Sequence, residues 1–234
     1  MKLIVKLTIL LMITNLSYGK TLKVMVLDTG VDSSNPFLVK YIPNKYLNDD
    51  NKTDEHGHGS HIVGILTLKA CRDVQLIPCK AFEYKNNEAL GKVKDRTIDC
   101  LNLALEYQVD IINYSGGGNK KGSFEFNLFN KLDKLGVKII TAAGNNGKNI
   151  DINENYYYPA SYKLKNRTVV GNIDKNHIIH STSNYGKNVI YEIGVNVRSF
   201  DNKGNLVYMS GTSQSTAIYT SKLIEEFCKN NLNY

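Results

Sequence analysis

The chain has 234 residues, of which 42% are hydrophobic and 22% charged, which is enough apolar content for one sizeable core and a single domain. The formal net charge of +7 comes from 29 Lys and Arg against 22 Asp and Glu, and the lysines are scattered. No basic stripe with interleaved aromatic residues is present, so we expect a solvated cationic surface and no nucleic-acid partner.

The first 19 residues have the three parts of an export signal. Lys2 and Lys6 make a charged start, residues 7–13 are apolar, and Ser17-Tyr18-Gly19 places small residues at a cleavage position. The apolar run is too short to span a membrane, and no cysteine follows it that would carry a lipid anchor. We expect cleavage after Gly19 and a secreted or periplasmic domain of residues 20–234 without a membrane anchor.

Strand and helix patterns alternate through the rest of the chain. Strands are expected at residues 21–27, 74–82, 109–115 and 137–143, with shorter ones near 168–173, 189–193 and 206–209. Helices are expected around 62–68, 95–108 and 123–135 and after Gly211, whereas residues 33–55 are expected to be loop. This alternation predicts an α/β fold, a three-layer sandwich whose central sheet is mostly parallel.

Residues able to do chemistry stand where these strands end or these helices begin. They are Asp28, His58, Ser115, Asn145 and Ser213. The carboxyl edge of a parallel sheet is where ligands and catalytic groups collect, and a helix N-terminus favours negative charge developing near a serine. A nucleophilic serine needs a base, an orienting carboxylate and an oxyanion donor, and this set supplies one of each. Taken alone, Ser213 is equally well interpreted as a helix N-cap.

The order Asp, His, Ser along the chain differs from the order in chymotrypsin and in α/β-hydrolases and is the order found in subtilisin. The chain resembles a subtilisin-like serine protease in five blocks. These are Asp28-Thr29-Gly30, His58-Gly59-Ser60-His61-Ile62-Val63-Gly64, Ser115-Gly116-Gly117, Ala142-Ala143-Gly144-Asn145 and Gly211-Thr212-Ser213. The resemblance covers nearly everything after residue 20, and five ordered blocks are far more specific than any single one.

The resemblance implies a monomeric serine endopeptidase that acts on polypeptide substrates and needs no cofactor or metal. Ser213 would be the nucleophile and His58 its general base and later its general acid. Asp28 would hold the imidazole in place, and Asn145 would donate its side-chain amide to the oxyanion together with the backbone N–H of Ser213.

The same resemblance predicts how a substrate binds. An extended peptide should pair as an added strand along Ser115-Gly116-Gly117, with Gly144 also lining the site. Gly116 stands where many relatives carry a larger apolar residue, which predicts an open pocket for the fourth residue upstream of the cut. The Tyr158-Pro159 segment matches the family's lining of the primary specificity pocket, where the peptide bond is cis, so a cis bond is expected here.

Three interpretations of the primary pocket stay open. Tyr157 narrows it and restricts the enzyme to small or medium uncharged residues, which is the interpretation we favour. Alternatively, Asp151 and Glu154 lie near its mouth and favour basic side chains. In the third interpretation, residues 148–156 form a solvated loop that touches no substrate.

Departures from the family pattern carry expectations of their own. Gln214-Ser215-Thr216-Ala217 replaces the Met-Ala and later proline that follow the serine in many members, which alters how the catalytic helix begins. The helix of His58 runs on to Cys71 without the loop that forms the tightest calcium site in many subtilisins, so we expect no calcium there. The first strand begins directly after the predicted cleavage point, so we expect a compact form without a folding pro-domain.

The four cysteines in an exported chain permit disulfides, with three possible full pairings. We favour Cys71 with Cys79, which would close a short loop between a helix and the following strand. Cys100 and Cys228 each lie on a helical pattern, and buried free thiols are at least as well supported for them.

Rival interpretations use the same residues. Asp28-Thr29-Gly30 also occurs in aspartic proteases, but that chemistry needs two carboxylates sharing a proton, and the chain has no second Asp-Thr-Gly. A zinc site is the second rival. Its ligands would be His56, His58 and His61 with Asp54 or Glu55. This interpretation leaves Ser213 and Asn145 without a purpose, and we expect His61 to be a packed core histidine.

The third rival is a different functional class, a catalytically silent subtilisin-like module that binds peptides or partners.

Overall fold

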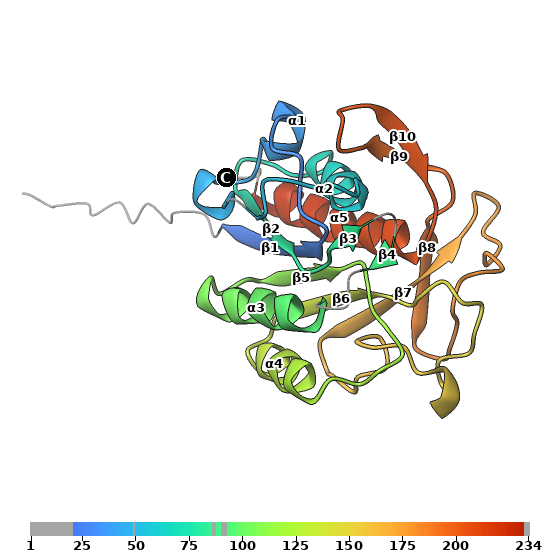
Figure 1. Cartoon of the computed structure of the whole chain (residues 1–234). Coiled ribbons are helices and arrows are strands. Elements are labelled where there is room, and N and C mark those ends of the chain that lie inside the picture. The colour runs from blue at the N-terminus through green and yellow to red at the C-terminus, as the bar shows by residue number, and fades with distance from the viewer. Residues whose placement is uncertain (1–20, 49, 86–87, 90–92, 232–234) are drawn as a thin grey trace, which may run out of the picture.

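A single parallel sheet forms the centre of the molecule. The computed structural model describes residues 21–48, 50–85, 88–89 and 93–231, so the expected signal segment of residues 1–19 lies outside the described residues. Six strands pair in the order β2-β1-β5-β6-β7-β8, every pair parallel (Figure 1). They are β1 (Leu22–Asp28), β2 (Val74–Lys80), β5 (Ile111–Tyr114), β6 (Lys138–Ala142), β7 (Arg167–Ile173) and β8 (Val189–Ile193).

Helices cover both faces of this sheet. On one face lie α2 (His58–Thr67) and α5 (Thr212–Asn231), and on the other α3 (Val93–Glu106) and α4 (Ser123–Lys134) (Figure 1). The expected α/β three-layer sandwich is confirmed. Among the described residues, none of the helices combines the length and apolar character needed to cross a bilayer.

Several short strands and helical turns lie outside the central sheet and its covering helices. Two antiparallel hairpins join β3 (Tyr84–Lys85) to β4 (Glu88–Ala89) and β9 (Val197–Phe200) to β10 (Leu206–Met209). The segment expected to be loop holds the one-turn helix α1 (Pro36–Val39), whose start is capped by the Asn35 side chain, and a 3-10 turn at Asn44–Tyr46. A second such turn lies at Asn153–Asn155.

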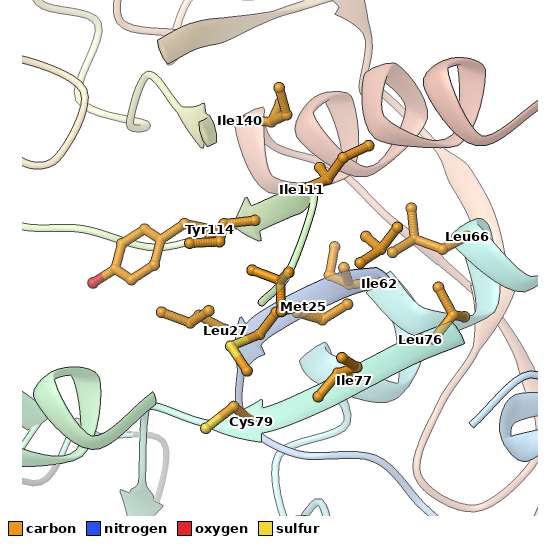
Figure 2. Packing of buried hydrophobic residues seen from close by; sticks show 14 of the residues in the cluster. Met25, Leu27, Ile62, Leu66, Leu76, Ile77, Cys79, Ile111, Tyr114 and Ile140 are labelled. Atoms are coloured by element: carbon orange, nitrogen blue, oxygen red, sulfur yellow. The ribbon is translucent and has the colours of Figure 1, made fainter. Parts of the chain in front are cut away.

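The core lies on both sides of β1 because this strand is buried on both faces, as central strands of parallel sheets are. Met25 and Leu27 of β1 lie in register with Ile77 and Cys79 of β2 and belong to the same core cluster as Tyr114 of β5 (Figure 2). Ile62 and Leu66, one helical turn apart on α2, are fully buried. Burying each such side chain contributes about 1.5–3 kcal/mol, and together they fix α2 on the sheet.

The strand order creates the edge at which the site forms. The chain passes from β1 to β2 on one side and later returns to place β5 on the other side of β1. A crevice forms outside the carboxyl ends of strands where the order reverses in this way. Leu27 of β1 pairs with Tyr114 of β5, so Asp28 and Ser115, the next residues, are neighbours at that edge.

Two disulfides replace the expected cysteine arrangement. Cys71 pairs with Cys228, and Cys79 pairs with Cys100, so the predicted pairing of Cys71 with Cys79 and the predicted free thiols are wrong. The reason is the layering of the fold. Cys71 follows α2 and bonds to α5, which covers the same face of the sheet, whereas Cys79 bonds to α3 on the opposite face (Figure 1).

Candidate active site

The acid and base candidates are in contact. Asp28 ends β1 and is 1% exposed, and its Oδ1 lies 2.7 Å from Nδ1 of His58, the first residue of α2. The same oxygen accepts the backbone N–H of Thr29 at 2.8 Å. Because a carboxylate only accepts, Nδ1 carries the proton and Nε2 is left as the basic nitrogen.

A second carboxylate, Asp54, organises the start of α2. Its Oδ1 accepts the hydroxyl of Thr29 and the N–H of Gly57, each at 2.8 Å, and its Oδ2 accepts the N–H of Ser60 at 2.7 Å. A buried carboxylate at this place satisfies free helix N–H groups and holds Thr29 beside Asp28. From the sequence, we expect Asp54 to matter only as a zinc ligand. Asp54 stands three residues before Gly57, which occupies the N-cap position of α2, so no N-cap pattern marks it in the sequence.

The charges around His58 adjust its basicity. Burial lowers the pKa of His58, but the carboxylates of Asp28 and Asp54 and the hydrogen bond to Asp28 outweigh burial, so the pKa is raised above its usual value. The group therefore holds a proton more readily, as a general base should, while its Nε2 is free of the Asp28 contact.

Ser213 stands next to Ser115 at the sheet edge. It is the second residue of α5 and 8% exposed, and its Oγ donates to the carbonyl oxygen of Ser115 at 2.8 Å. In return, the Ser115 hydroxyl donates to the carbonyl of Ser213 at 3.2 Å. The structure thus brings Ser213 to the edge at which the Asp28 and His58 pair lies. In this resting arrangement the Ser213 hydroxyl donates its hydrogen bond to the carbonyl of Ser115 and not to His58.

Asn145 faces the start of the same helix. Its Oδ1 accepts the backbone N–H of Thr212 at 2.9 Å and the Thr212 hydroxyl at 3.1 Å. The amide oxygen of Asn145 thus accepts hydrogen bonds from Thr212. Because the side chain is exposed, its amide nitrogen, Nδ2, can donate a hydrogen bond to a bound group. The backbone N–H of Ser213, in the first turn of α5, lacks a carbonyl partner from its own helix.

A tyrosine ring fills the slot between two of the glycine-containing blocks. A Cβ built on Gly117 would lie 2.6 Å from the Tyr157 ring, and one on Gly144 would lie 3.1 Å from it. The peptide bond between Tyr158 and Pro159 is cis, as predicted. Gly118 and Tyr158 exchange backbone hydrogen bonds of 2.9 and 2.7 Å, which close this wall of the site.

The subtilase family profile matches residues 19–223. The chain belongs to the subtilase family. It is 29% identical over 214 residues to the "Major intracellular serine protease" of Bacillus subtilis, covering 84% of this chain and 65% of that protein. It is 31% identical over 212 residues to "Subtilisin-like protease 1" of Pseudogymnoascus destructans, covering 86% of this chain and 50% of that protein. The chain thus spans about half to two thirds of the length of these relatives.

Solved structures agree on the fold. A cold-adapted subtilisin-like serine proteinase superposes with a TM-score of 0.74 at 20% identity, covering 91% of this chain and 77% of that one. A mutant of the protease domain of PatA gives a TM-score of 0.71 at 20% identity, covering 92% of this chain and 84% of that one.

This subtilase does not leave the space over Gly116 empty. A Cβ there would lie 2.3 Å from the ring of Phe82, so that ring occupies the space over Gly116. An open cavity of about 360 Å³ lies beside it, with Tyr114 and Tyr158 in its lining. The expected open space at Gly116 is therefore wrong, because the ring of Phe82 fills it.

The other two histidines of the subtilase's histidine-rich segment do not converge on His58. His61 is fully buried, as expected, and its Nε2 lies 3.1 Å from the carbonyl of Val197. Burial, followed by the charge of His58, lowers the pKa of His61 to about 4. The His56 ring centroid is 6.1 Å from that of His58. In the part of the chain that the structure describes, no three His, Cys, Asp or Glu side chains form a group that could hold a metal.

The two acidic residues considered for the primary pocket, Asp151 and Glu154, line different cavities. Asp151 accepts the N–H of Lys187 at 2.8 Å and packs against Gly186. Glu154 lines a cavity of about 320 Å³ together with Tyr157 and Lys148. A cationic side chain thus shares the cavity with Glu154.

Proposed function

We propose that this protein is a serine endopeptidase that hydrolyses polypeptides through an acyl-enzyme on Ser213. One observation carries the proposal. The Asp28 and His58 pair, joined at 2.7 Å, and Ser213, bonded to Ser115, lie at the same carboxyl edge of β1 and β5 in a chain of the subtilase family. A monomer without cofactor suffices for this chemistry.

In the proposed reaction, Ser213 Oγ attacks the scissile carbonyl carbon while Nε2 of His58 takes its proton. The carbonyl oxygen becomes an oxyanion that accepts hydrogen bonds from Nδ2 of Asn145 and the N–H of Ser213. As the C–N bond breaks, His58 gives the proton to the leaving amine. Water then attacks the acyl carbon with His58 again as base, the bond from that carbon to Ser213 Oγ breaks, and His58 returns the proton to this oxygen, which releases the acid product and restores the free enzyme. Asp28 accepts the Nδ1 hydrogen bond and stabilises the imidazolium that forms in each half of the reaction.

We further propose that Tyr157 restricts the residue immediately before the cut to small or medium uncharged side chains. The contact of its ring with the positions of Gly117 and Gly144 supports this, because a long side chain would have to displace the ring. Profiling of cleavage sites in a denatured protein library tests it. A strong preference for Lys, Arg or Phe immediately before the cut would contradict it.

Export by a signal peptide of residues 1–19, leaving a domain of residues 20–234, is also proposed. The charged and apolar segments of that stretch support it, and two disulfides are compatible with an oxidising compartment. Relatives carry names of both kinds, such as "Major intracellular serine protease" and "Minor extracellular protease Epr". Mass spectrometry of the protein from culture medium or periplasm should find an N-terminus at Lys20.

A fluorophosphonate probe separates the proposed enzyme from a silent binding module of the same fold. We expect the wild type to be labelled and Ser213→Ala to remain unlabelled, with labelling and peptidase activity unchanged in EDTA. Absence of labelling in a well-folded wild type would favour the silent module. Loss of activity in EDTA that returns with added metal would revive the zinc interpretation.

A further inference from the structure

A buried path of hydrogen bonds connects the middle of α5 to the candidate nucleophile. The hydroxyl of Thr220 donates to Oδ1 of Asn113 at 2.9 Å, and Nδ2 of Asn113 donates to Oγ of Ser115 at 2.9 Å. The Ser115 hydroxyl donates to the carbonyl of Ser213 at 3.2 Å, and the Ser213 hydroxyl donates back to the carbonyl of Ser115 at 2.8 Å. Thr220 and Asn113 are fully buried.

The directions of these bonds leave one consistent arrangement. Ser115 Oγ gives its hydrogen to Ser213, so it must accept from Asn113, which fixes the amide nitrogen toward Ser115. The amide oxygen then faces Thr220, whose hydroxyl supplies the hydrogen. A fully satisfied buried network of this kind is rigid, because any member that turns leaves a buried polar group without a partner.

The path also sets how α5 sits on the sheet. Ser213 and Thr220 are seven residues apart, which is two helical turns, so they lie on the same face of α5. Asn113 belongs to β5, which is held between β1 and β6 by ladders on both sides. The two attachments, at Ser115 and at Asn113, therefore fix both the position of α5 along the strand and its rotation about its own axis.

We propose that Thr220 and Asn113 are positioning residues that hold the Ser213 hydroxyl in register with the His58 base. The inference rests on the proposed function. Both residues are fully buried, so the effect is carried through Ser115 and the first turn of α5. A shift of about 1 Å at a reacting group can cost about a hundredfold in rate, so a modest relaxation of this path is sufficient to be measured.

Thr220→Val tests the path because it keeps the shape of the side chain and removes the donated hydrogen. We expect kcat to fall about tenfold to a hundredfold with KM within about threefold, since the change acts on alignment and not on substrate contacts. Thr220→Ser keeps the hydroxyl and should restore kcat to within about threefold of the wild type. Thr216→Val is the matched control. This residue is on the same helix and equally buried, but its hydroxyl donates at 2.7 Å to the carbonyl of Thr212 in its own helix.

Ser115→Ala provides a second variant that keeps the main-chain carbonyl and breaks the path at its other end. Thr220→Val and Ser115→Ala are then combined in one protein. The fold-loss of kcat in this double variant should be smaller than the product of the two single losses, because both changes interrupt one path. Thermal unfolding of each variant reports stability separately. Equal kcat in Thr220→Val and Thr216→Val, or no rescue by Thr220→Ser, would overturn the inference while leaving the proposed function intact. A folded wild type that neither reacts with fluorophosphonate nor cleaves peptides would overturn both.

Discussion

The two halves of the candidate site are held in place by different kinds of contact. In the half that carries the base, Asp54 bonds backbone groups two to six residues away and so shapes the turn into α2. In the half that carries the nucleophile, the bonds join residues far apart in sequence. Thr212 and Asn145 are 67 residues apart, Ser213 and Ser115 are 98, and Thr220 and Asn113 are 107.

This difference means that the two halves depend on folding differently. The start of α2 is held mostly by contacts two to thirty residues away in sequence, with the bonds of His61 to Val197 and of Asp54 to Asn202 as exceptions. Ser213 is placed only when α5 has docked on β5 and β6. The disulfide between Cys71 and Cys228 connects the two helices near the ends away from the site. The nucleophile half should therefore be the more sensitive one to any loosening of the tertiary structure.

The largest expected effect shows whether the halves act as one unit. Ser213→Ala and His58→Ala should each lower kcat by about 10⁴-fold or more, because each removes an indispensable partner in the same proton transfer. The double variant should be little worse than either single one. Kinetics on a peptide substrate, with circular dichroism to confirm folding, measure this. Losses that multiply would show that the two residues act independently and would contradict the proposed mechanism.

Removing the disulfides tests the link between the halves. In the chain-entropy description, a cross-link that closes a longer loop stabilises more, about 5 kcal/mol for a separation of 157 residues and about 3 kcal/mol for 21. The Cys71→Ser, Cys228→Ser double variant should therefore lose more unfolding free energy in urea than the Cys79→Ser, Cys100→Ser variant. It should also lose activity at a lower temperature. The reverse order would show that the α3 attachment matters more than the α5 attachment.

The contrast between the halves also explains what the sequence could predict. The ordered blocks, the parallel sheet and the cis bond before Pro159 follow from short segments whose residues interact locally or repeat a family pattern. The disulfide pairing could not be predicted, because it depends on which face of the sheet Cys71 and Cys79 occupy. The bond from Thr220 to Asn113 has no local signal either, since a buried threonine on a helix looks the same whichever strand it meets.

Asn145→Leu tests the nucleophile half alone. The substitution removes the proposed oxyanion donor and also the acceptor of the Thr212 N–H. Loss of one such donor costs about 3 kcal/mol of transition-state stabilisation, so kcat should fall about 100-fold to 1,000-fold with little change in KM. Asn145→Asp keeps an acceptor for Thr212 and should be just as slow, because a carboxylate cannot donate. Wild-type kcat in either variant would remove Asn145 from the mechanism.

The half that carries the base contains His61, whose protonation should make the free energy of unfolding depend on pH. The pKa of His61 is lowered from 6.5 to about 4 in the folded protein, so between these pH values the unfolded chain binds more protons. The unfolding free energy should therefore fall as the pH drops from 6.5 toward 4, by about 3 kcal/mol from this group. His61→Leu should flatten that slope, measured by urea unfolding at several pH values. His56→Gln, at an exposed position, is the control and should leave most of the slope in place.

The smallest expected effect concerns the wall that the long-range contacts build against the substrate. Tyr157 occupies its slot because Gly117 and Gly144, from separate blocks, leave room for its ring. Tyr157→Ala should open this slot and raise kcat/KM for substrates with Phe before the cut relative to those with Ala. A change of about 1–3 kcal/mol, or roughly tenfold to a hundredfold, is typical for altered apolar contacts in a pocket. Tyr156→Ala, next in the chain, is the matched control, because its ring packs instead against that of Tyr158, with centroids 6.1 Å apart. An unchanged Phe to Ala ratio in Tyr157→Ala would mean that the substrate side chain binds elsewhere, with the cavity beside Phe82 as the next place to test.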